Sequence, residues 1–206
     1  MNAILDAAEA SIAERGFERA TTNHIADAAG ISVGSLYRWF PDKQAIAAHL
    51  AERYIERVMG IVDDVFDRHT DESTPLLIRI VLREIATGWL AQPALANLVA
   101  VSFGPVATNA PAARLRSLLI DRANALLALR VPGIPDRERQ IVATLCIGLF
   151  EGALLEASSD PGSSGDLIDE AAYAIAAYLA MKYPFETSHR WLDPMEELPP
   201  SRPSVQ

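Results

Sequence analysis

The segment from residue 21 to residue 40 limits the possible folds most, because it predicts two short helices with a tight turn between them. Thr21 or Thr22 can cap the first helix, and Gly30 ends it with the backbone freedom that such a turn needs. Ser32 can cap the second helix, which we expect to run through Phe40. A pair of this kind can place its second helix in the major groove of DNA while the first crosses the backbone.

Further helices are expected on both sides of this pair. One precedes Gly16, and a long one starts at Pro41-Asp42. On the second helix of the pair, three side chains should face inward: Leu36, Tyr37 and Phe40. The two flanking helices carry apolar stripes made of Ile4, Leu5, Ala8 and Ile12, and of Ile46, Leu50 and Tyr54.

Beyond residue 55 the pattern changes to longer and more apolar helices, and strand signals are nearly absent. The spacing predicts helices at 75–92, 93–103, 111–130, 136–158 and 166–183, separated by clusters of proline, glycine and serine. We therefore predict an all-α fold. It comprises a three-helix helix-turn-helix domain over residues 1–54 and a larger helical domain over residues 55–183. Residues 184–206 contain five prolines and form a tail, which we expect to pack on the protein through Trp191 and Leu192.

Composition favours a cytoplasmic protein. The single cysteine, Cys146, excludes a disulfide framework, and the acidic N-terminus lacks the basic start of a signal peptide. Residues 85–113 are uncharged, but three prolines interrupt them, so we expect no membrane span. The net charge of −9 argues against a protein that coats nucleic acid without sequence preference. We expect no cofactor and no metal, because the four histidines lack ligand spacing.

From Ile4 to Leu50 the sequence resembles the DNA-binding domain of the TetR family of transcription regulators. Three stretches carry the resemblance: Ala13-Glu-Arg-Gly-Phe17, Thr22-x-x-Ile25-Ala26-x-x-Ala29-Gly30-Ile31-Ser32, and Gly34-Ser35-Leu36-Tyr37-x-x-Phe40-x-x-Lys43. The resemblance implies a homodimer that binds a palindromic operator in double-stranded DNA. It also implies a small, mostly hydrophobic effector that releases the protein from DNA, with repression as the usual mode.

The same resemblance implies which residues meet DNA. Val33, Gly34 and Ser35 would face base edges. Tyr37 would contact a phosphate with Trp39 near the backbone, although either aromatic could instead be a packing residue. Phosphates would also bind Thr22 and Lys43, each at a helix start, with Asn23 directed at DNA. An alternative for Lys43 is an ordinary solvated side chain. Arg38 is our own candidate contact, as the only cation on the third helix.

Two helical stripes in the second domain have the spacing of a helix-packing seam. The first comprises Ile141, Leu145, Gly148, Gly152 and Leu155, and the second comprises Ile168, Ala172, Ile175 and Leu179. Paired across two subunits, these stripes would form a four-helix dimer interface, as the resemblance implies. The alternative is that both stripes belong to the core of one chain.

Between these regions lie apolar and aromatic residues with a few amides, which suit a cavity for a small hydrophobic ligand. The candidates are Met59, Val62, Phe66, Trp89, Asn97, Phe103 and Asn109. The alternative for each is plain core. The resemblance implies that a ligand preferring the spread state moves the long helix from Asp42 through Met59 and separates the two DNA-reading domains.

Two other functions fit parts of the sequence. Gly30-Ile-Ser-Val-Gly34 spells the nucleophile pattern of hydrolases, but that pattern needs a preceding strand and none is predicted, so we do not expect an enzyme. A helical interaction protein without DNA binding is the second alternative, since residues 1–54 carry five Lys/Arg against seven Asp/Glu.

Overall fold

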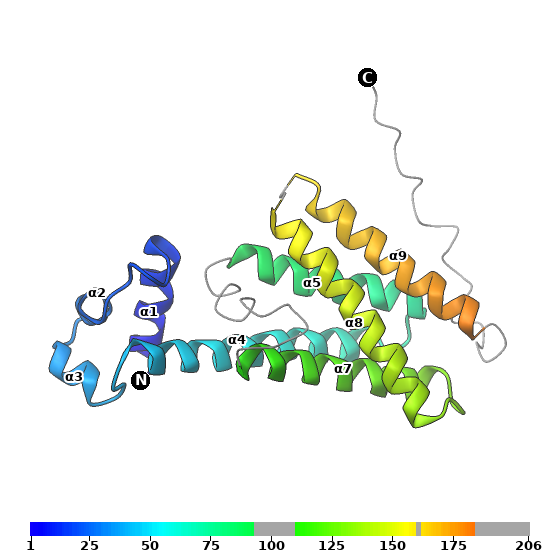
Figure 1. Ribbon diagram of the computed structural model, residues 1–206, viewed down its shortest axis with the longest axis horizontal. Helices are drawn as coiled ribbons and strands as arrows, with labels where there is room; N and C mark the ends of the chain where they lie inside the picture. The colour runs from blue at the N-terminus through cyan, green and yellow to red at the C-terminus, as the bar shows by residue number, and fades with distance from the viewer. Residues whose placement is uncertain (93–109, 160–161, 184–206) are drawn as a thin grey trace, which may run out of the picture. The chain divides into compact units, whose positions relative to one another are not determined.

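The computed structural model describes residues 1–92, 110–159 and 162–183. These residues form helices and no strand, which confirms the predicted all-α fold (Figure 1). The helices are α1 (Asn2–Arg15), α2 (Thr22–Ala28), α3 (Val33–Tyr37), α4 (Lys43–Arg68), α5 (Thr74–Ala91), α7 (Ala110–Arg130), α8 (Asp136–Ser159) and α9 (Ser164–Lys182). The helix expected at 93–103 and the tail 184–206, with Trp191 and Leu192, lie outside the described residues.

The second of the two short helices is shorter than predicted. It ends at Tyr37, and Phe40 lies beyond it, buried, with its amide donating to the carbonyl of Leu36 at 3.0 Å. Pro41 explains the early end, because a proline disfavours helical backbone at the residue before it.

The chain forms two compact units that interleave along the sequence. Unit 1 comprises Met1–Gly60 with Thr87–Leu118, and unit 2 comprises Ile61–Ala86 with Leu119–Gln206. This division differs from the predicted one after residue 54, because α4 continues without a break through that position into unit 2.

The core of unit 1 is built from one face of each of its first helices. Ile12 of α1, Ile25 of α2, Leu36 of α3 and Leu50 of α4 are almost completely buried. In unit 2, α8 and α9 lie side by side, and their core residues include Phe150, Leu154, Ile168 and Leu179 (Figure 1).

Candidate nucleic-acid interface and ligand cavity

Side-chain caps fix where α2, α3 and α4 begin. The Thr21 hydroxyl accepts from the amide of His24 at 3.2 Å, and the Ser32 hydroxyl accepts from the amide of Ser35 at 3.1 Å. Asp42 accepts from the amide of Ala45 at 2.7 Å. Each cap satisfies an amide that has no partner inside its own helix, so the short helices are held at defined starting points.

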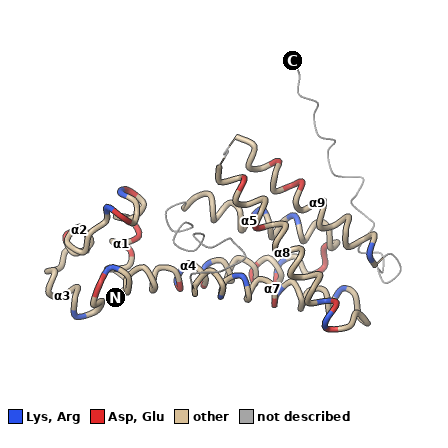
Figure 2. The backbone as a smooth tube through the Cα atoms, in the orientation of Figure 1, with Lys and Arg blue, Asp and Glu red and all other residues tan. Residues whose placement is uncertain are grey.

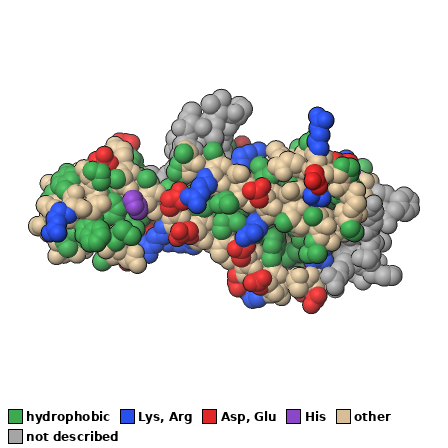
Figure 3. Space-filling model, turned by 90° about the horizontal axis from the view of Figure 1, so that it is seen from below, with side chains coloured by type: hydrophobic (Ala, Val, Ile, Leu, Met, Phe, Trp, Pro, Cys, Tyr) green, Lys and Arg blue, Asp and Glu red, His purple; other side chains and the backbone are tan. Residues whose placement is uncertain are grey.

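The outer face of α3 is open to solvent. Gly34 and Arg38 are exposed, and Val33 and Ser35 are partly exposed. Hydrophobic side chains lie beside a basic one at the α1–α3 end of unit 1 (Figure 3). A helix that is buried on its Leu36 side and open on the other can lie in a groove of DNA.

Tyr37 does not face inward as predicted. It is 49 % exposed, and its hydroxyl lies 3.1 Å from that of Thr22, so it joins the end of α3 to the start of α2. Trp39 is 59 % exposed. The two aromatics therefore do not belong to the core, and they are available to a partner. Asn23 is exposed beside Thr22 at the same helix start.

Lys43 is directed into the protein. Its ammonium donates to the carbonyls of Phe17 at 2.9 Å and Glu18 at 3.3 Å, and it lies 4.4 Å from the centre of the Phe17 ring. The two carbonyls take two of the three N–H donors of the ammonium. The structure thus gives Lys43 a role that the sequence did not indicate, namely fixing the start of α4 to the loop after α1.

Few charges lie on the helix-turn-helix. The tube over α2 and α3 is mostly uncharged in Figure 2. Among the described residues, the cation closest in sequence to the exposed residues of α3 is Arg38, which directly follows that helix. A nucleic acid bound there would meet few cations and would depend more on backbone amides and neutral hydrogen bonds.

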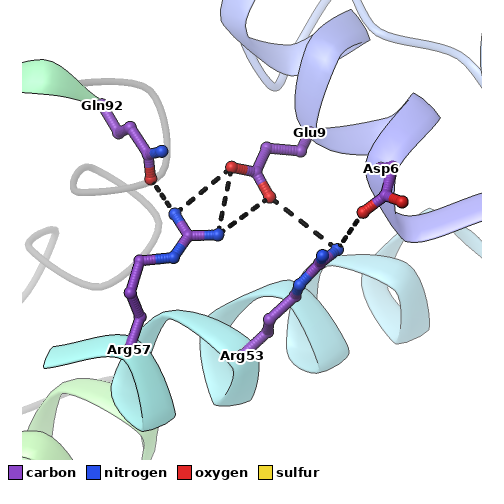
Figure 4. A network of polar contacts seen from close by, with 5 residues as sticks. All are labelled: Asp6, Glu9, Arg53, Arg57 and Gln92. Carbon is purple, nitrogen blue, oxygen red and sulfur yellow. Dashed lines mark hydrogen bonds and ion pairs between the residues drawn. The ribbon is translucent and has the colours of Figure 1, made fainter. Parts of the chain in front are cut away.

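A polar network attaches α1 to α4 within unit 1 (Figure 4). Arg53 contacts Asp6 at 2.5 Å and Glu9 at 4.0 Å, and Arg57 contacts Glu9 at 3.3 Å and also Gln92. Glu9 is the less exposed of the two carboxylates, and it lies between both guanidinium groups.

Unit 2 contains a cavity of about 90 Å³ that is lined almost wholly by apolar side chains. Of the residues proposed from the sequence to bind a ligand, Val62 and Phe66 of α4 line it, together with residues of α5, α7, α8 and α9. Met59 and Trp89 belong to unit 1 and are not among the lining residues; Trp89 packs at 6.1 Å from the Tyr54 ring. Asn97, Phe103 and Asn109 lie outside the described residues.

Three lining residues of the cavity can make polar interactions that the sequence analysis missed. Thr74 is 2 % exposed, and its hydroxyl has no hydrogen-bond partner among the residues that the structure describes. Arg122 and Arg130 also line the cavity. Burial raises the pKa of the Cys146 thiol, which lies in the same wall, to about 11. No spacing signal could have found these residues, because only the fold brings α5, α7 and α8 around one space.

The two predicted packing stripes lie in different environments. On α8, Ile141, Leu145, Gly152 and Leu155 are exposed and Gly148 is partly exposed. Among the described helices, α8 is the one that is long and apolar enough to cross a membrane. Half of that apolar stretch is buried inside the protein.

The α9 stripe is buried within its own chain. Its four residues are at most 5 % exposed, and Ile175 and Leu179 line the cavity. These residues are Ile168, Ala172, Ile175 and Leu179. They belong to the core and not to an outer surface, which corresponds to the alternative interpretation of this stripe. The apolar face that α9 does expose carries Tyr173, Ala174 and Met181 instead.

Two sequence profiles match this chain. The profile of bacterial regulatory proteins of the tetR family matches residues 4–50, and that of the tetracyclin repressor-like C-terminal domain matches residues 75–179, about half of the chain. The chain belongs to the TetR family. The predicted resemblance is thus confirmed, and it extends well beyond the helix-turn-helix.

The sequences of curated relatives match a limited part of this TetR-family chain. The nucleoid occlusion factor SlmA of Haemophilus ducreyi is 33 % identical over 69 residues, which cover 34 % of this chain and 33 % of that protein. The repressor KstR2 of Rhodococcus jostii is 37 % identical over 68 residues, 33 % of this chain and 30 % of that protein. The chain thus matches about a third of the length of each.

Solved structures share the fold over most of the chain. SmeT, the repressor of a Stenotrophomonas maltophilia multidrug efflux pump, superposes with a TM-score of 0.66 at 20 % identity, covering 100 % of this chain and 96 % of SmeT. FadR of Thermus thermophilus, solved with lauroyl-CoA, gives 0.61 at 21 % identity, covering 84 % of this chain and 92 % of FadR. At these identities the likeness concerns the fold alone.

The hydrolase pattern at Gly30–Gly34 has a structural explanation in the TetR-family fold. Ser32 is the cap of α3, and the residue stretch before it is α2 and a turn, not a strand. Within residues 1–92, 110–159 and 162–183, no three His, Cys, Asp or Glu side chains cluster as metal ligands.

Proposed function

We propose that this TetR-family protein is a cytoplasmic, homodimeric transcriptional repressor that leaves a palindromic operator when a small hydrophobic effector binds in unit 2. The observation that carries the proposal is the open face of α3, held on a capped and well-buried helix-turn-helix. The apolar cavity in unit 2 and the exposed apolar face of α8 support the effector and the homodimer, respectively.

DNA recognition would use the open side of α3 and the starts of nearby helices. Val33, Gly34 and Ser35 would meet base edges, and Arg38 would supply a bidentate donor. Phosphates would bind the Thr22–Tyr37 hydroxyl pair, Asn23 and the region around Trp39. Lys43 would join them through the one ammonium N–H that its two carbonyl bonds leave.

The effector would act through α4. The same continuous helix contributes Ile46 and Leu50 to the core beneath the helix-turn-helix, and Val62 and Phe66 to the cavity wall. A ligand that binds better to a second position of α4 would shift the population toward it, and that is the condition for release from DNA.

Gly34 offers a direct test of the α3 face. A Cβ built at Gly34 meets only the Ser32 hydroxyl at 4.0 Å, and one at Gly60 of α4 meets nothing within 4 Å. Gly34→Leu should therefore fold normally and block entry into the groove, with operator affinity reduced at least about a hundredfold. Gly60→Leu is the matched control, which should bind as the wild type does. Affinity would be measured by fluorescence anisotropy on an operator selected from random DNA.

Two outcomes would contradict the proposal. Recovery of no palindrome from random DNA would favour a helical interaction protein that does not read DNA. Equal DNA affinity of Gly34→Leu and the wild type would exclude the α3 face. Binding should also weaken steeply with added salt, because phosphate contacts release counterions.

A further inference from the structure

The cavity in unit 2 continues into a groove on the surface of the same unit. The groove has a volume of about 420 Å³, and it shares Phe66, Arg122, Leu126 and Arg130 with the cavity. Its other lining residues include the carboxylates Asp63 and Asp67. An apolar space that opens past two guanidinium groups suits a ligand with an apolar body and one polar end.

The buried hydroxyl of Thr74 indicates where that polar end belongs. This side chain is 2 % exposed and lines the cavity, yet its oxygen has no partner among the described atoms. A buried hydroxyl without a partner is costly, and it becomes satisfied when it donates a hydrogen bond to a ligand oxygen.

Thr74 is also the first residue of α5, a helix of 18 residues. The first amides of a helix lack partners and its N-terminus carries a partial positive charge, so it favours an anion. No acidic residue occupies the first turn of α5. Arg130, whose guanidinium donates to the carbonyl of Thr70 at 2.8 Å, adds a full positive charge where cavity and groove meet.

The charge of the ligand is limited by the other groups in the groove. Arg122 is already paired with Asp63, at 2.9 Å and 3.1 Å, and Asp67 adds a second carboxylate. A group with several negative charges would be repelled there, whereas a single carboxylate at Thr74 and Arg130 would remain on the cavity side.

The size of the cavity limits the apolar part of the ligand. A dry cavity of about 150 Å³ holds benzene, so by simple scaling about 90 Å³ holds roughly four carbon atoms. A long acyl chain would require the wall to move.

From these observations, and resting on the proposed function, we propose that the effector is a small monocarboxylate. Its alkyl or aryl part occupies the apolar cavity, and its carboxylate accepts from the Thr74 hydroxyl beside Arg130.

The first experiment measures ligand binding without DNA. Straight-chain carboxylates of two to twelve carbons would be titrated into the full-length protein by calorimetry, with 1-butanol, butylamine and lauroyl-CoA as comparisons. We expect the tightest binding at four to six carbons, and butyrate ahead of the alcohol and the amine. Tighter binding of butylamine, of dodecanoate or of lauroyl-CoA would overturn the proposal.

Thr74→Val gives a second, more specific readout. The substitution removes an unpartnered hydroxyl and keeps the shape, so the ligand-free protein should melt at the same or a higher temperature. Butyrate should nevertheless bind about tenfold more weakly. The matched control is Thr144→Val, because the Thr144 hydroxyl is exposed and donates to the carbonyl of Gln140. Unchanged butyrate affinity in Thr74→Val would refute the assigned position.

Cys146 reports where the carboxylate binds, since it is the one cysteine of the chain and lines the cavity. Saturating butyrate should slow its alkylation by iodoacetamide at pH 9, and no slowing would place the ligand elsewhere and refute the proposal. Failure of the proposed function has a different result: butyrate would bind to the protein but leave its affinity for the operator unchanged. Operator binding without any carboxylate binding would reject this inference alone.

Discussion

Lys43 and Arg38 carry the same charge five residues apart, but their surroundings give them different tasks. Lys43 binds two backbone carbonyls and an aromatic ring, whereas Arg38 is exposed at the end of α3. Lys43→Met should lower the free energy of unfolding by about 1–3 kcal/mol, because it removes charge-assisted bonds and a cation–π contact. Urea denaturation of the full-length protein measures this loss.

Arg38→Met is the matched variant, for which we expect a change in DNA affinity and not in stability. It should leave the free energy of unfolding within about 0.5 kcal/mol of the wild type and reduce operator affinity about tenfold or more. If Lys43→Met kept full stability and lost DNA affinity, its ammonium would be a phosphate contact, as the resemblance implied.

The Cys146 thiol should react slowly in the folded protein. Burial raises its pKa from 9.0 to about 11, so at pH 8.5 the thiolate fraction is about a hundredfold smaller than in the unfolded chain. Mass spectrometry after timed iodoacetamide treatment, with and without urea, measures the two rates. Because the unfolded thiol ionises first, this group also contributes a loss of stability between pH 9 and about 11. Equal rates in both states would contradict the burial argument.

At the residue scale, the sequence indicated candidate residues more reliably than the contacts that those residues make in the fold. Val62 and Phe66 were expected near a ligand cavity because the resemblance implies one there, and both line the cavity of unit 2. Thr74 and Arg130 were not, because their relation depends on how α5 and α7 pack.

At the scale of elements, the turn between α2 and α3 depends on one backbone conformation. Gly30 has a φ of 66°, and a Cβ there would meet nothing within 4 Å, so the cost of a side chain is conformational and not steric crowding. Gly30→Ala should destabilise the protein by about 1–2 kcal/mol, and Gly30→Asn by less, since asparagine tolerates this region. Thermal unfolding measures both.

Gly34→Ala is the control for that series. Gly34 is helical and its φ is not positive, so alanine should leave stability unchanged or raise it by up to about 1 kcal/mol. A Gly30→Ala protein as stable as Gly34→Ala would show that the turn does not need the left-handed conformation.

The contact of α1 with α4 depends on a network in which the two carboxylates differ. Glu9 lies between Arg53 and Arg57 and is 21 % exposed, whereas Asp6 is 59 % exposed and contacts Arg53 alone (Figure 4). Glu9→Gln should lower the free energy of unfolding by about 1 kcal/mol, and Asp6→Asn by less than about 0.5 kcal/mol. Chemical denaturation at low and at 0.5 M salt would compare them, and a larger effect of Asp6→Asn would contradict this ranking.

The start of a helix was predictable from sequence where a nearby side chain can cap it. Ser32 and Asp42 cap α3 and α4 as a hydroxyl or carboxylate before a helix predicts. The face that α9 turns outward was not predictable, because both of its faces carry apolar side chains. Only packing on α8 decides that Ile168 is inside and Tyr173 outside.

At the scale of the whole molecule, an exposed apolar face requires a partner or a reason to be stable in water. Ile141, Leu145 and Leu155 form such a face on α8, and Tyr173 and Met181 of the neighbouring helix α9 are also exposed. Single apolar residues on a surface are ordinary, but a continuous row on a long helix is typical of an interface. The proposed homodimer would pair this row with the same row of a second copy about a two-fold axis.

Leu145→Glu tests that dimer. A carboxylate placed in a buried apolar seam lacks a partner, so the subunits should separate by analytical ultracentrifugation, with the helical content of each subunit retained because Leu145 is exposed in the single chain. Leu129→Glu on α7 is the control, since Leu129 is 70 % exposed and belongs to neither predicted packing stripe. Loss of the dimer should also lower affinity for a palindrome far more than for a half-site, because two linked α3 helices bind with a high effective concentration. A Leu145→Glu protein that remains a dimer would place the interface elsewhere. A Leu145→Glu monomer that binds the full palindrome as tightly as the wild type would separate dimerisation from DNA recognition.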